Sequence, residues 1–170
     1  ETFIHGAICI SMSGRCLISS YMTGKDANNG ECTHPCRWNY ALMEEKRDGE
    51  YFPVYEDDRG TYLYNSKDLC LLDRIGELVK MGSASGKIEG RMKSIMYVSI
   101  VTGVYRQAID LAVKDADNYK PLPEWRHLLE SVSNRGYIEG FYGGEYDTNA
   151  VNRETSGYSR SAAFLGVALK

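Results

Sequence analysis

The chain has 170 residues, of which 43% are hydrophobic and 25% are charged, and its formal net charge is −3 at pH 7. This length suits one ordinary domain, and the apolar fraction supports a packed core, so the composition excludes an intrinsically disordered chain and a coiled coil. Because charges of both signs are mixed along the chain, it has no broad positive field, and any contact with a nucleic acid has to be local.

The hydropathy pattern predicts the cellular compartment, and the first residues indicate whether the chain is a fragment. The sequence has no apolar run long enough to cross a bilayer and no charged-then-apolar leader, so we expect a cytoplasmic protein that does not enter a membrane. The first residue is Glu1, and the apolar pattern that follows it is that of a strand already in progress. We therefore expect the chain to be a fragment of a longer polypeptide.

The first third of the sequence predicts one buried strand, a long loop and a hairpin. Residues 2–10 form a short apolar run with β-branched residues, which is typical of a strand buried on both faces. From residue 11 to 36 the periodicity is lost and turn-forming residues dominate. In residues 51–65, two runs rich in Tyr and Val flank the turn sequence at Asp58 to Gly60, which predicts a β-hairpin.

The remaining sequence alternates helices with short strands. Apolar residues at helical spacing in 66–82 predict a helix capped by Asn65 or Ser66, and 86–90 is a strand candidate. A strongly amphipathic pattern predicts a helix over 94–113, and another helix begins at Pro123. The tail is rich in Gly and Tyr and ends in an apolar run. This order predicts an α/β fold with strands 2–10 and 86–90 in one sheet.

Four of the five cysteines stand in the polar early segment, with the spacing C-x6-C-x15-C-x3-C: Cys9, Cys16, Cys32 and Cys36. A disulfide framework is disfavoured because the sequence shows no secretory leader and the expected core needs no covalent cross-links. Only the last pair has the spacing of a zinc knuckle, whereas glycine-punctuated loops can wrap a larger iron–sulfur cluster. Buried cysteines are also common core fillers, and that interpretation suits Cys70, which lies in the apolar stripe of the predicted helix.

The opening stretch ETFIHGAICISMSGRCLIS closely resembles the signature of the U32 peptidase family, the collagenase-like proteins. The matching positions are Glu1, Phe3, Gly6, Ala7, Ile8, Cys9, Gly14, Cys16, Ile18 and Ser19. The later segments GECTHPCRW, GEYFPVYEDDRGTYLYNSKDL, KIEGRMKS and YRQAID are also similar to that family, so the resemblance covers most of the chain. One departure is Gly86, where members usually have an apolar residue, and this loosens the expected strand before Ile88.

The resemblance implies a fold and a division of the chain. Members are built on a TIM-barrel-like α/β domain followed by a smaller C-terminal domain. We therefore expect residues 1–118 to be the end of the barrel, with the Cys-rich loop at 9–36 and the hairpin at 51–65. Residues 119–170 then hold a helix, a segment rich in Gly and Tyr, and the start of the C-terminal domain.

The resemblance also implies two kinds of activity. Some members are described as collagenases. Others act in hydroxylation, and one branch modifies the wobble uridine of tRNA with prephenate. Several members carry a [4Fe–4S] cluster, here on cysteines matching Cys9, Cys16 and Cys32, with Cys36 as the nearest fourth ligand and Cys70 as the second candidate; zinc and no metal are the alternatives. We expect tRNA, a prephenate-like anion and a paralogous U32 protein as partners.

Elementary chemistry weakens the peptidase alternative. A cysteine or serine protease needs an imidazole next to its nucleophile, and the chain has only His5, His34 and His127. No HExxH motif is present for a zinc protease. His5 lies on the buried strand, where it is either a base or a satisfied core histidine, and no motif in the sequence supports hydrolysis.

A site for an anionic substrate is easier to assemble. If strands 2–10 and 86–90 end at the mouth of a barrel, Glu89, Arg91 and Lys93 lie beside the cysteine loop. Arg91 and Lys93 then hold the anion, with Lys67 as a further candidate, while Glu89 or His5 moves protons. The structural alternative is a salt bridge between Glu89 and Arg91. Arg37 and Trp38 offer RNA a cation and a stacking surface.

Overall fold

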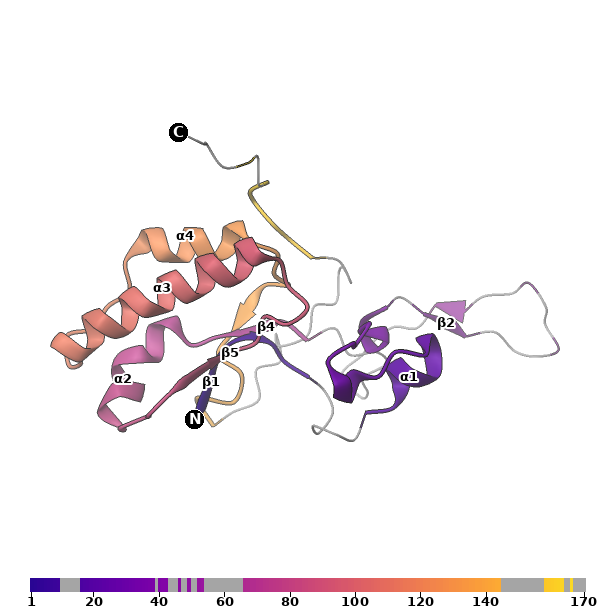
Figure 1. The fold of residues 1–170 in the computed structure, drawn as a ribbon, viewed down its shortest axis with the longest axis horizontal. Helices are drawn as coiled ribbons and strands as arrows, with labels where there is room; N and C mark the ends of the chain where they lie inside the picture. The colour runs from indigo at the N-terminus through magenta and orange to yellow at the C-terminus, as the bar shows by residue number, and fades with distance from the viewer. Residues whose placement is uncertain are drawn as a thin grey trace. The chain divides into compact units, whose positions relative to one another are not determined.

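The chain forms two compact units, each described here by itself (Figure 1). Unit 1 comprises Glu1–Ile8, Lys67–Asp147 and Tyr158–Lys170, and unit 2 comprises Cys9–Ser66 and Thr148–Gly157. The structure is a computed structural model, and it describes residues 1–9, 16–38, 40–42, 46, 49, 52–53, 66–144, 158–163 and 166. Within these residues, no helix is long and apolar enough to cross a membrane.

Unit 1 is built on a four-stranded mixed sheet in the order β5-β1-β4-β6. The strands are β5 (Gly86–Ile88), β1 (Thr2–Ala7), β4 (Asp68–Cys70) and β6 (Tyr137–Ile138). β1 runs parallel to β5 and antiparallel to β4, and β4 runs parallel to β6. The predicted α/β class and the pairing of the two predicted strands are therefore confirmed. The TIM-barrel assignment is finer than this sheet and stays a prediction.

Three helices of unit 1 pack with the sheet around one hydrophobic core (Figure 1). They are α2 (Ile75–Lys80), α3 (Ile95–Lys114) and α4 (Pro123–Ser131), and α3 contacts both of the others. The α3 residues that face the core are Tyr97, Val101, Val104, Tyr105, Ala108 and Ala112. Their spacing of three and four residues places them on one side of the helix, which explains why the sequence predicted this helix correctly.

The starts of the two longer helices follow local capping rules. The Ser94 side chain accepts a hydrogen bond of 3.2 Å from the backbone N–H of Tyr97, which satisfies one donor of the first turn of α3. Pro123 occupies the first turn of α4, where its missing N–H costs nothing. Both starts agree with the sequence prediction.

The predicted helix over 66–82 is only partly correct. Its first part is strand β4, then come a 3-10 turn, η3 (Leu72–Arg74), and the short helix α2. All of Asp68, Leu69 and Cys70 are buried, and this segment pairs with β1 on one side and β6 on the other. Tertiary pairing on both edges therefore overrides the helical spacing of the leucines. Ser66 caps no helix, and Asn65 lies outside the described residues.

The predicted hairpin over 51–65 is mostly beyond what the structure describes. Strand β3 (Phe52–Pro53) pairs antiparallel with β2 (Ala41–Leu42). The expected turn at Asp58 to Gly60 and the second run of the hairpin lie outside the described residues, as does most of the terminal apolar run at 163–170.

Unit 2 is held by short elements and local polar contacts. Its remaining elements are α1 (Ile18–Thr23), η1 (Ala27–Asn29) and η2 (Pro35–Arg37). The Ser19 hydroxyl lies 3.1 Å from the Thr33 hydroxyl and accepts a hydrogen bond of the same length from the Thr33 backbone N–H. Because Ser19 is buried, these contacts tie α1 to the segment that leads into η2.

Candidate functional site

Unit 1 contains several buried polar residues, called here the polar cluster. Its members are His5, Asp68, Lys93, Tyr97, Tyr105 and Arg135. They come from β1, β4, the segment between β5 and α3, α3 itself and the turn before β6. Polar groups are normally kept out of a core unless they bond to one another or to a ligand, so the bonds of each member are informative.

The hydrogen bonds around Tyr105 define the tautomer of His5. The Tyr105 hydroxyl donates its one proton to the carbonyl oxygen of Ile4 at 3.0 Å. The Nδ1 atom of His5, 3.2 Å from the same hydroxyl, is therefore the donor in that contact. Nε2 of His5 is then unprotonated, and it is buried with no hydrogen-bond partner within the described part of the chain. His5 thus offers a proton acceptor inside the core.

Burial and charge set the protonation of these groups. Desolvation, with a smaller contribution from Lys93, lowers the pKa of His5 to about 3, so the imidazole is neutral at physiological pH. Burial raises the pKa of Tyr105 well above its ordinary value, and it also raises the pKa of the Cys70 thiol. The Sγ atom of Cys70 lies 3.6 Å from the Tyr105 hydroxyl. His5 and Cys70 therefore both contact Tyr105 as neutral groups.

Lys93 is the buried cation of the cluster. Its Nζ atom lies 3.6 Å from Oδ2 of Asp68, with the two side chains 7% and 0% exposed, and donates a hydrogen bond of 3.0 Å to the carbonyl oxygen of Ser133. The ring centroids of Tyr97 and Tyr158 lie 5.0 and 4.2 Å from the same nitrogen. A buried ion pair of this kind is costly to break but adds little net stability. Its position in the core suits a functional role.

The predicted proton-transfer and anion-binding residues at 89–91 lie where β1 and β5 end. Glu89 follows β5, its backbone N–H donates to the carbonyl oxygen of His5 at 2.9 Å, and its carboxylate accepts 3.0 Å from the backbone N–H of Arg91. Arg91 is exposed. Among the described ion pairs none joins these two side chains, so in place of the alternative salt bridge the structure has a turn contact to the backbone. Gly6, at φ 124°, permits the close approach of Glu89.

Lys67, the other predicted anion-binding residue, stands at the start of β4 and is partly buried. A Cβ atom at Gly136 would lie 3.6 Å from Cδ of Lys67, so the apolar stem of the lysine runs along that turn. Long cationic side chains often lie this way, with the stem packed and the charged end toward water. The roles assigned to His5, Glu89, Arg91, Lys93 and Lys67 stay predictions.

The four clustered cysteines belong to unit 2, and Cys70 belongs to unit 1. All five are thiols and not disulfides; Cys9 is exposed, Cys70 is buried, and the others are intermediate. Within the described residues, no three His, Cys, Asp or Glu side chains are grouped as a metal site. Cys70 packs in the core of unit 1, which agrees with the filler interpretation, although it lies on β4 and not on a helix.

The backbone around Cys32 suits a thiolate. Its Sγ atom accepts a hydrogen bond of 3.4 Å from the backbone N–H of His34. His34 has φ 56°, a conformation that few residues other than glycine adopt, and Pro35 then begins η2. Hydrogen bonds to sulfur stabilise the negative charge of cluster ligands, and strained backbone of this kind is concentrated at functional sites. The donor set and this turn fit a cluster ligand at Cys32.

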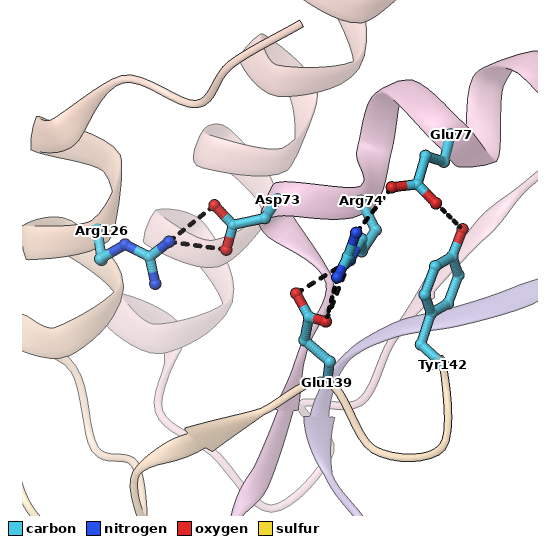
Figure 2. Close-up of polar contacts among 6 residues, drawn as sticks. All are labelled: Asp73, Arg74, Glu77, Arg126, Glu139 and Tyr142. Carbon is cyan, nitrogen blue, oxygen red and sulfur yellow. Dashed lines mark hydrogen bonds and ion pairs between the residues drawn. The ribbon is translucent and has the colours of Figure 1, made fainter. Parts of the chain in front are cut away.

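A second polar group in unit 1 is an exposed ion network and not a site (Figure 2). Arg74 donates to both carboxylate oxygens of Glu139 at 2.9 to 3.1 Å and to Glu77 at 2.9 Å, and the Tyr142 hydroxyl donates to Glu77 at 3.2 Å. A separate pair joins Arg126 to Asp73. Arg74 holds the pKa of Glu77 below its usual range. These contacts join α2 and η3 to the segment after β6 and to α4.

Sequence reasoning missed four members of the polar cluster: Asp68, Tyr97, Tyr105 and Arg135. Asp68 and Arg135 are charged residues in segments that resemble a helix start and a glycine-rich turn, and Tyr97 and Tyr105 lie in the predicted helix over 94–113. Charged residues are almost never fully buried without a partner, yet burial depends on contacts between segments far apart in the chain. The one available signal was Asp68 directly before the apolar run Leu69–Leu72.

The chain belongs to peptidase family U32, whose model, "Peptidase family U32", matches residues 1–152. It is 46% identical over 142 residues to an uncharacterised protease of Methanocaldococcus jannaschii, covering 84% of this chain and 34% of that protein. It is 42% identical over 145 residues to tRNA hydroxylation protein P1 of Bacillus subtilis, covering 85% of this chain and 34% of that protein.

A collagenase of Porphyromonas gingivalis is 30% identical over 170 residues, which is 100% of this chain and 40% of that protein. The chain therefore spans roughly a third of the length of the curated relatives it matches. No solved structure matches the chain. The family resemblance predicted from the sequence is confirmed, and the activity of the whole protein is a matter for proposal.

Proposed function

We propose that the protein supports the prephenate-dependent hydroxylation of the wobble uridine of tRNA. The observation that carries this proposal is similarity: tRNA hydroxylation proteins of Bacillus subtilis and Escherichia coli are 42% and 38% identical to the chain. The collagenase of Porphyromonas gingivalis is 30% identical. The alternative function is hydrolysis of collagen-like or unfolded peptides, which that name and the protease of Methanocaldococcus jannaschii favour.

The chemistry of unit 1 supports the first function over the second. A thiol protease needs a thiolate paired with an imidazolium, with both groups open to a peptide. His5 and Cys70 lie on paired positions of β1 and β4, but both contact Tyr105, both are buried, and burial shifts their pKa values toward the neutral forms. This pair therefore suits core packing and not nucleophilic attack.

Unit 2 supplies the proposed cofactor site. Cys9, Cys16, Cys32 and Cys36 would hold a [4Fe–4S] cluster, with zinc as the alternative metal. The backbone donor of His34 favours a thiolate at Cys32. When bound, the cluster would supply redox or Lewis-acid chemistry to the reaction.

Each unit, taken by itself, offers side chains for a proposed substrate. Trp38 is 42% exposed and stacks on Tyr40 with ring centroids 6.5 Å apart, so it offers a nucleic-acid base an aromatic surface. Arg91 is exposed and has no ion-pair partner among the described residues, so it can pair with an anion, and Glu89 stands beside it to hold or move a proton. We further propose that the sheet of unit 1 is part of a TIM-barrel-like domain, that a paralogous U32 protein is a partner and that the protein is cytoplasmic.

The decisive experiment compares two activities of the full-length protein. Its gene is introduced into an Escherichia coli strain lacking its own tRNA hydroxylation protein P, and tRNA nucleosides are analysed by mass spectrometry. Restoration of a wobble uridine that carries one additional oxygen atom supports the proposal. Cleavage of gelatin by the purified protein, with an unchanged nucleoside profile, would establish the alternative.

The cofactor is tested separately by counting iron and sulfide in anaerobically purified protein. We expect Cys9→Ala and Cys36→Ala to lose the iron, whereas Cys70→Ala keeps it, because Cys70 is buried in the core of unit 1. Iron retained by Cys36→Ala and lost from Cys70→Ala would move the fourth ligand to Cys70. Zinc without sulfide would replace the cluster with a zinc site.

A further inference from the structure

Arg135 is a buried guanidinium with unused donors. Its residue is 5% exposed, and Nε and Nη1 are buried with no hydrogen-bond partner among the residues that the structure describes. Its described contact is with the Tyr158 ring, whose centroid lies 3.9 Å from Cζ. An arginine cannot lose its charge to avoid this cost, and a buried charge without an acceptor is strongly destabilising. The side chain therefore calls for an anionic acceptor.

The backbone around Arg135 is rigidly held. Asn134 donates from Nδ2 to the carbonyl oxygen of Val132 at 2.8 Å and accepts through Oδ1 from the Gly136 backbone N–H at 2.9 Å. The Asn134 backbone also exchanges two hydrogen bonds, of 2.9 and 2.7 Å, with Ser159. Ser159 follows Tyr158 directly, so the bonds that fix Arg135 also fix the ring beside it. A preorganised cation of this kind is typical of a binding residue.

A second cation, Lys93, lies against the same aromatic ring as Arg135. Nζ of Lys93 lies 4.2 Å from the centroid of the Tyr158 ring that Arg135 also covers. Lys93 already pairs with Asp68, while Glu89 turns its carboxylate to the backbone N–H of Arg91. The two cations and the one carboxylate of Asp68 leave a net charge of +1, which one monoanionic group would neutralise. The buried hydroxyl of Tyr97, which has no hydrogen-bond partner in the described ranges, adds a neutral donor near Lys93.

We propose that Arg135, together with Lys93 and the Tyr158 ring, binds the oxyanion group, a carboxylate or a phosphate, of a small-molecule ligand. Arg135 donates charge-assisted hydrogen bonds to the oxygens, and Lys93 adds a point charge. Tyr158 is the wall of the subsite and keeps the two cations in place. This deepens the proposed function, since it rests on a substrate that carries an anionic group, and it assigns that group to Arg135 in addition to the predicted lysines.

The test titrates the full-length protein with sodium phosphate and, separately, with sodium malonate, at constant ionic strength set with sodium chloride. Calorimetry gives the dissociation constant for each probe, which distinguishes a phosphate site from a carboxylate site. For the better probe, we expect Arg135→Gln to bind about 10- to 100-fold more weakly, as loss of charge-assisted hydrogen bonds predicts. Arg135→Lys keeps the charge but lacks the planar donors. We expect its affinity for the probe to lie between those of the wild type and Arg135→Gln.

The matched control is Arg106→Gln, an exposed arginine of α3 paired with Asp110, which we expect to bind as the wild type does. Failure of both probes to bind the wild-type protein would overturn the proposal, as would equal binding by Arg135→Gln. Thermal unfolding without either probe is a second measurement. The proposal expects Arg135→Gln to keep or raise the unfolding temperature, because an uncompensated buried charge is removed.

A large drop in that temperature would mean that Arg135 pairs with an acidic group of the protein itself, and the proposal would fail. If Arg135→Gln does not fold, binding by the wild type and by Arg135→Lys decides the question. The outcome is independent of the proposed reaction. Anion binding that depends on Arg135, in a protein that leaves tRNA unmodified, would retain this subsite and reject the hydroxylation proposal.

Discussion

The internal contacts that stabilise unit 1 differ from those that stabilise unit 2. In unit 1, Tyr105 bonds to Ile4 and His5, about a hundred residues earlier in the chain, and a continuous apolar core surrounds these contacts. In unit 2, the described side-chain bonds join near neighbours, such as Ser19 with Thr33, and its buried residues among those described are Ser19 and Pro35. Unit 1 is thus stabilised by its own packing. The described residues of unit 2 form no comparable apolar core, and the proposed cluster is our candidate for a further constraint there.

Among the changes that test this comparison, we expect a substitution at Gly6 to have the largest effect on stability. Its backbone has φ 124°, and a Cβ atom there would lie 2.5 Å from the carbonyl oxygen of Glu89. Backbone strain costs about 1–3 kcal/mol, and overpacking against a fixed atom costs about as much again. We expect Gly6→Ala to lower the free energy of unfolding of unit 1 by about 3 kcal/mol or more, measured by urea denaturation.

The control for this change is Gly82→Ala. Gly82 also has positive φ, at 73°, but no atom lies within 4 Å of the position of its Cβ. It therefore carries the strain without the clash and should lose about 1 kcal/mol. Equal losses at the two glycines would mean that the approach of Glu89 to β1 contributes nothing to the stability of the sheet.

Removal of iron tests the same comparison in unit 2. A ligand bound only by the folded state, present at a hundred times its dissociation constant, stabilises that state by about 2.7 kcal/mol. We therefore expect chelation of the anaerobically purified protein to raise amide hydrogen exchange in residues 16–38 by about a hundredfold, with little change in residues 95–114. Exchange that rises equally in both segments, or in neither, would contradict a constraint specific to unit 2.

A low pH should lower the free energy of unfolding of unit 1, because His5 is protonated more readily in the unfolded state. The pKa of His5 is about 3 in the folded state, because of burial and then Lys93, against about 6.5 for an unfolded histidine. The unfolded state therefore binds the additional proton between these values, so stability is complete above pH 6.5 and falls as the pH drops toward 3. The slope approaches about 1.4 kcal/mol per pH unit, or about 2 kcal/mol between pH 6.5 and 5.

The measurement is the free energy of urea unfolding at several pH values. His5→Gln should flatten the slope in this window, whatever its effect on absolute stability. His127→Gln, which changes an exposed histidine of α4, is the matched control for the substitution itself. An unchanged slope in His5→Gln would mean that His5 is protonated in the folded core and that Nε2 is not the acceptor described here.

The contrast between the two units also explains what the sequence could predict. Helices α3 and α4 follow from local signals, since their apolar spacing and their starts at Ser94 and Pro123 lie within a few residues of each other. Strand β4 was missed because its three residues continue the helical spacing of 69–75, and only pairing with β1 and β6 makes it a strand.

The two candidate sites differ in the same way. The cysteines of unit 2 were found from composition and from a family signature, which need no tertiary structure. Arg135 was not found because its burial arises when residues 158–159, beyond a long intervening segment, return to bond with Asn134. A charged residue in a glycine-rich segment normally indicates an exposed loop, so no local signal distinguishes Arg135 from a solvated arginine.

The smallest effect is expected in the ion network of Figure 2, which tests whether unit 1 depends on its core alone. Arg74 binds Glu139 through two nitrogens and also pairs with Glu77, but its side chain is 38% exposed. Exposed ion pairs contribute little and are screened by salt. We expect Arg74→Met to lower the unfolding temperature slightly in low salt and not at all in high salt.

Arg106→Met removes a simple exposed pair within α3 and should have a still smaller effect, because Arg74 joins separate segments of the chain, whereas Arg106 pairs with Asp110 one turn away. Equal shifts for the two variants would mean that the contacts between α2 and the segment after β6 add nothing beyond a helix pair. A large loss for Arg74→Met that persists in high salt would instead make this network part of what holds unit 1 together, and the apolar core would no longer account for its stability by itself.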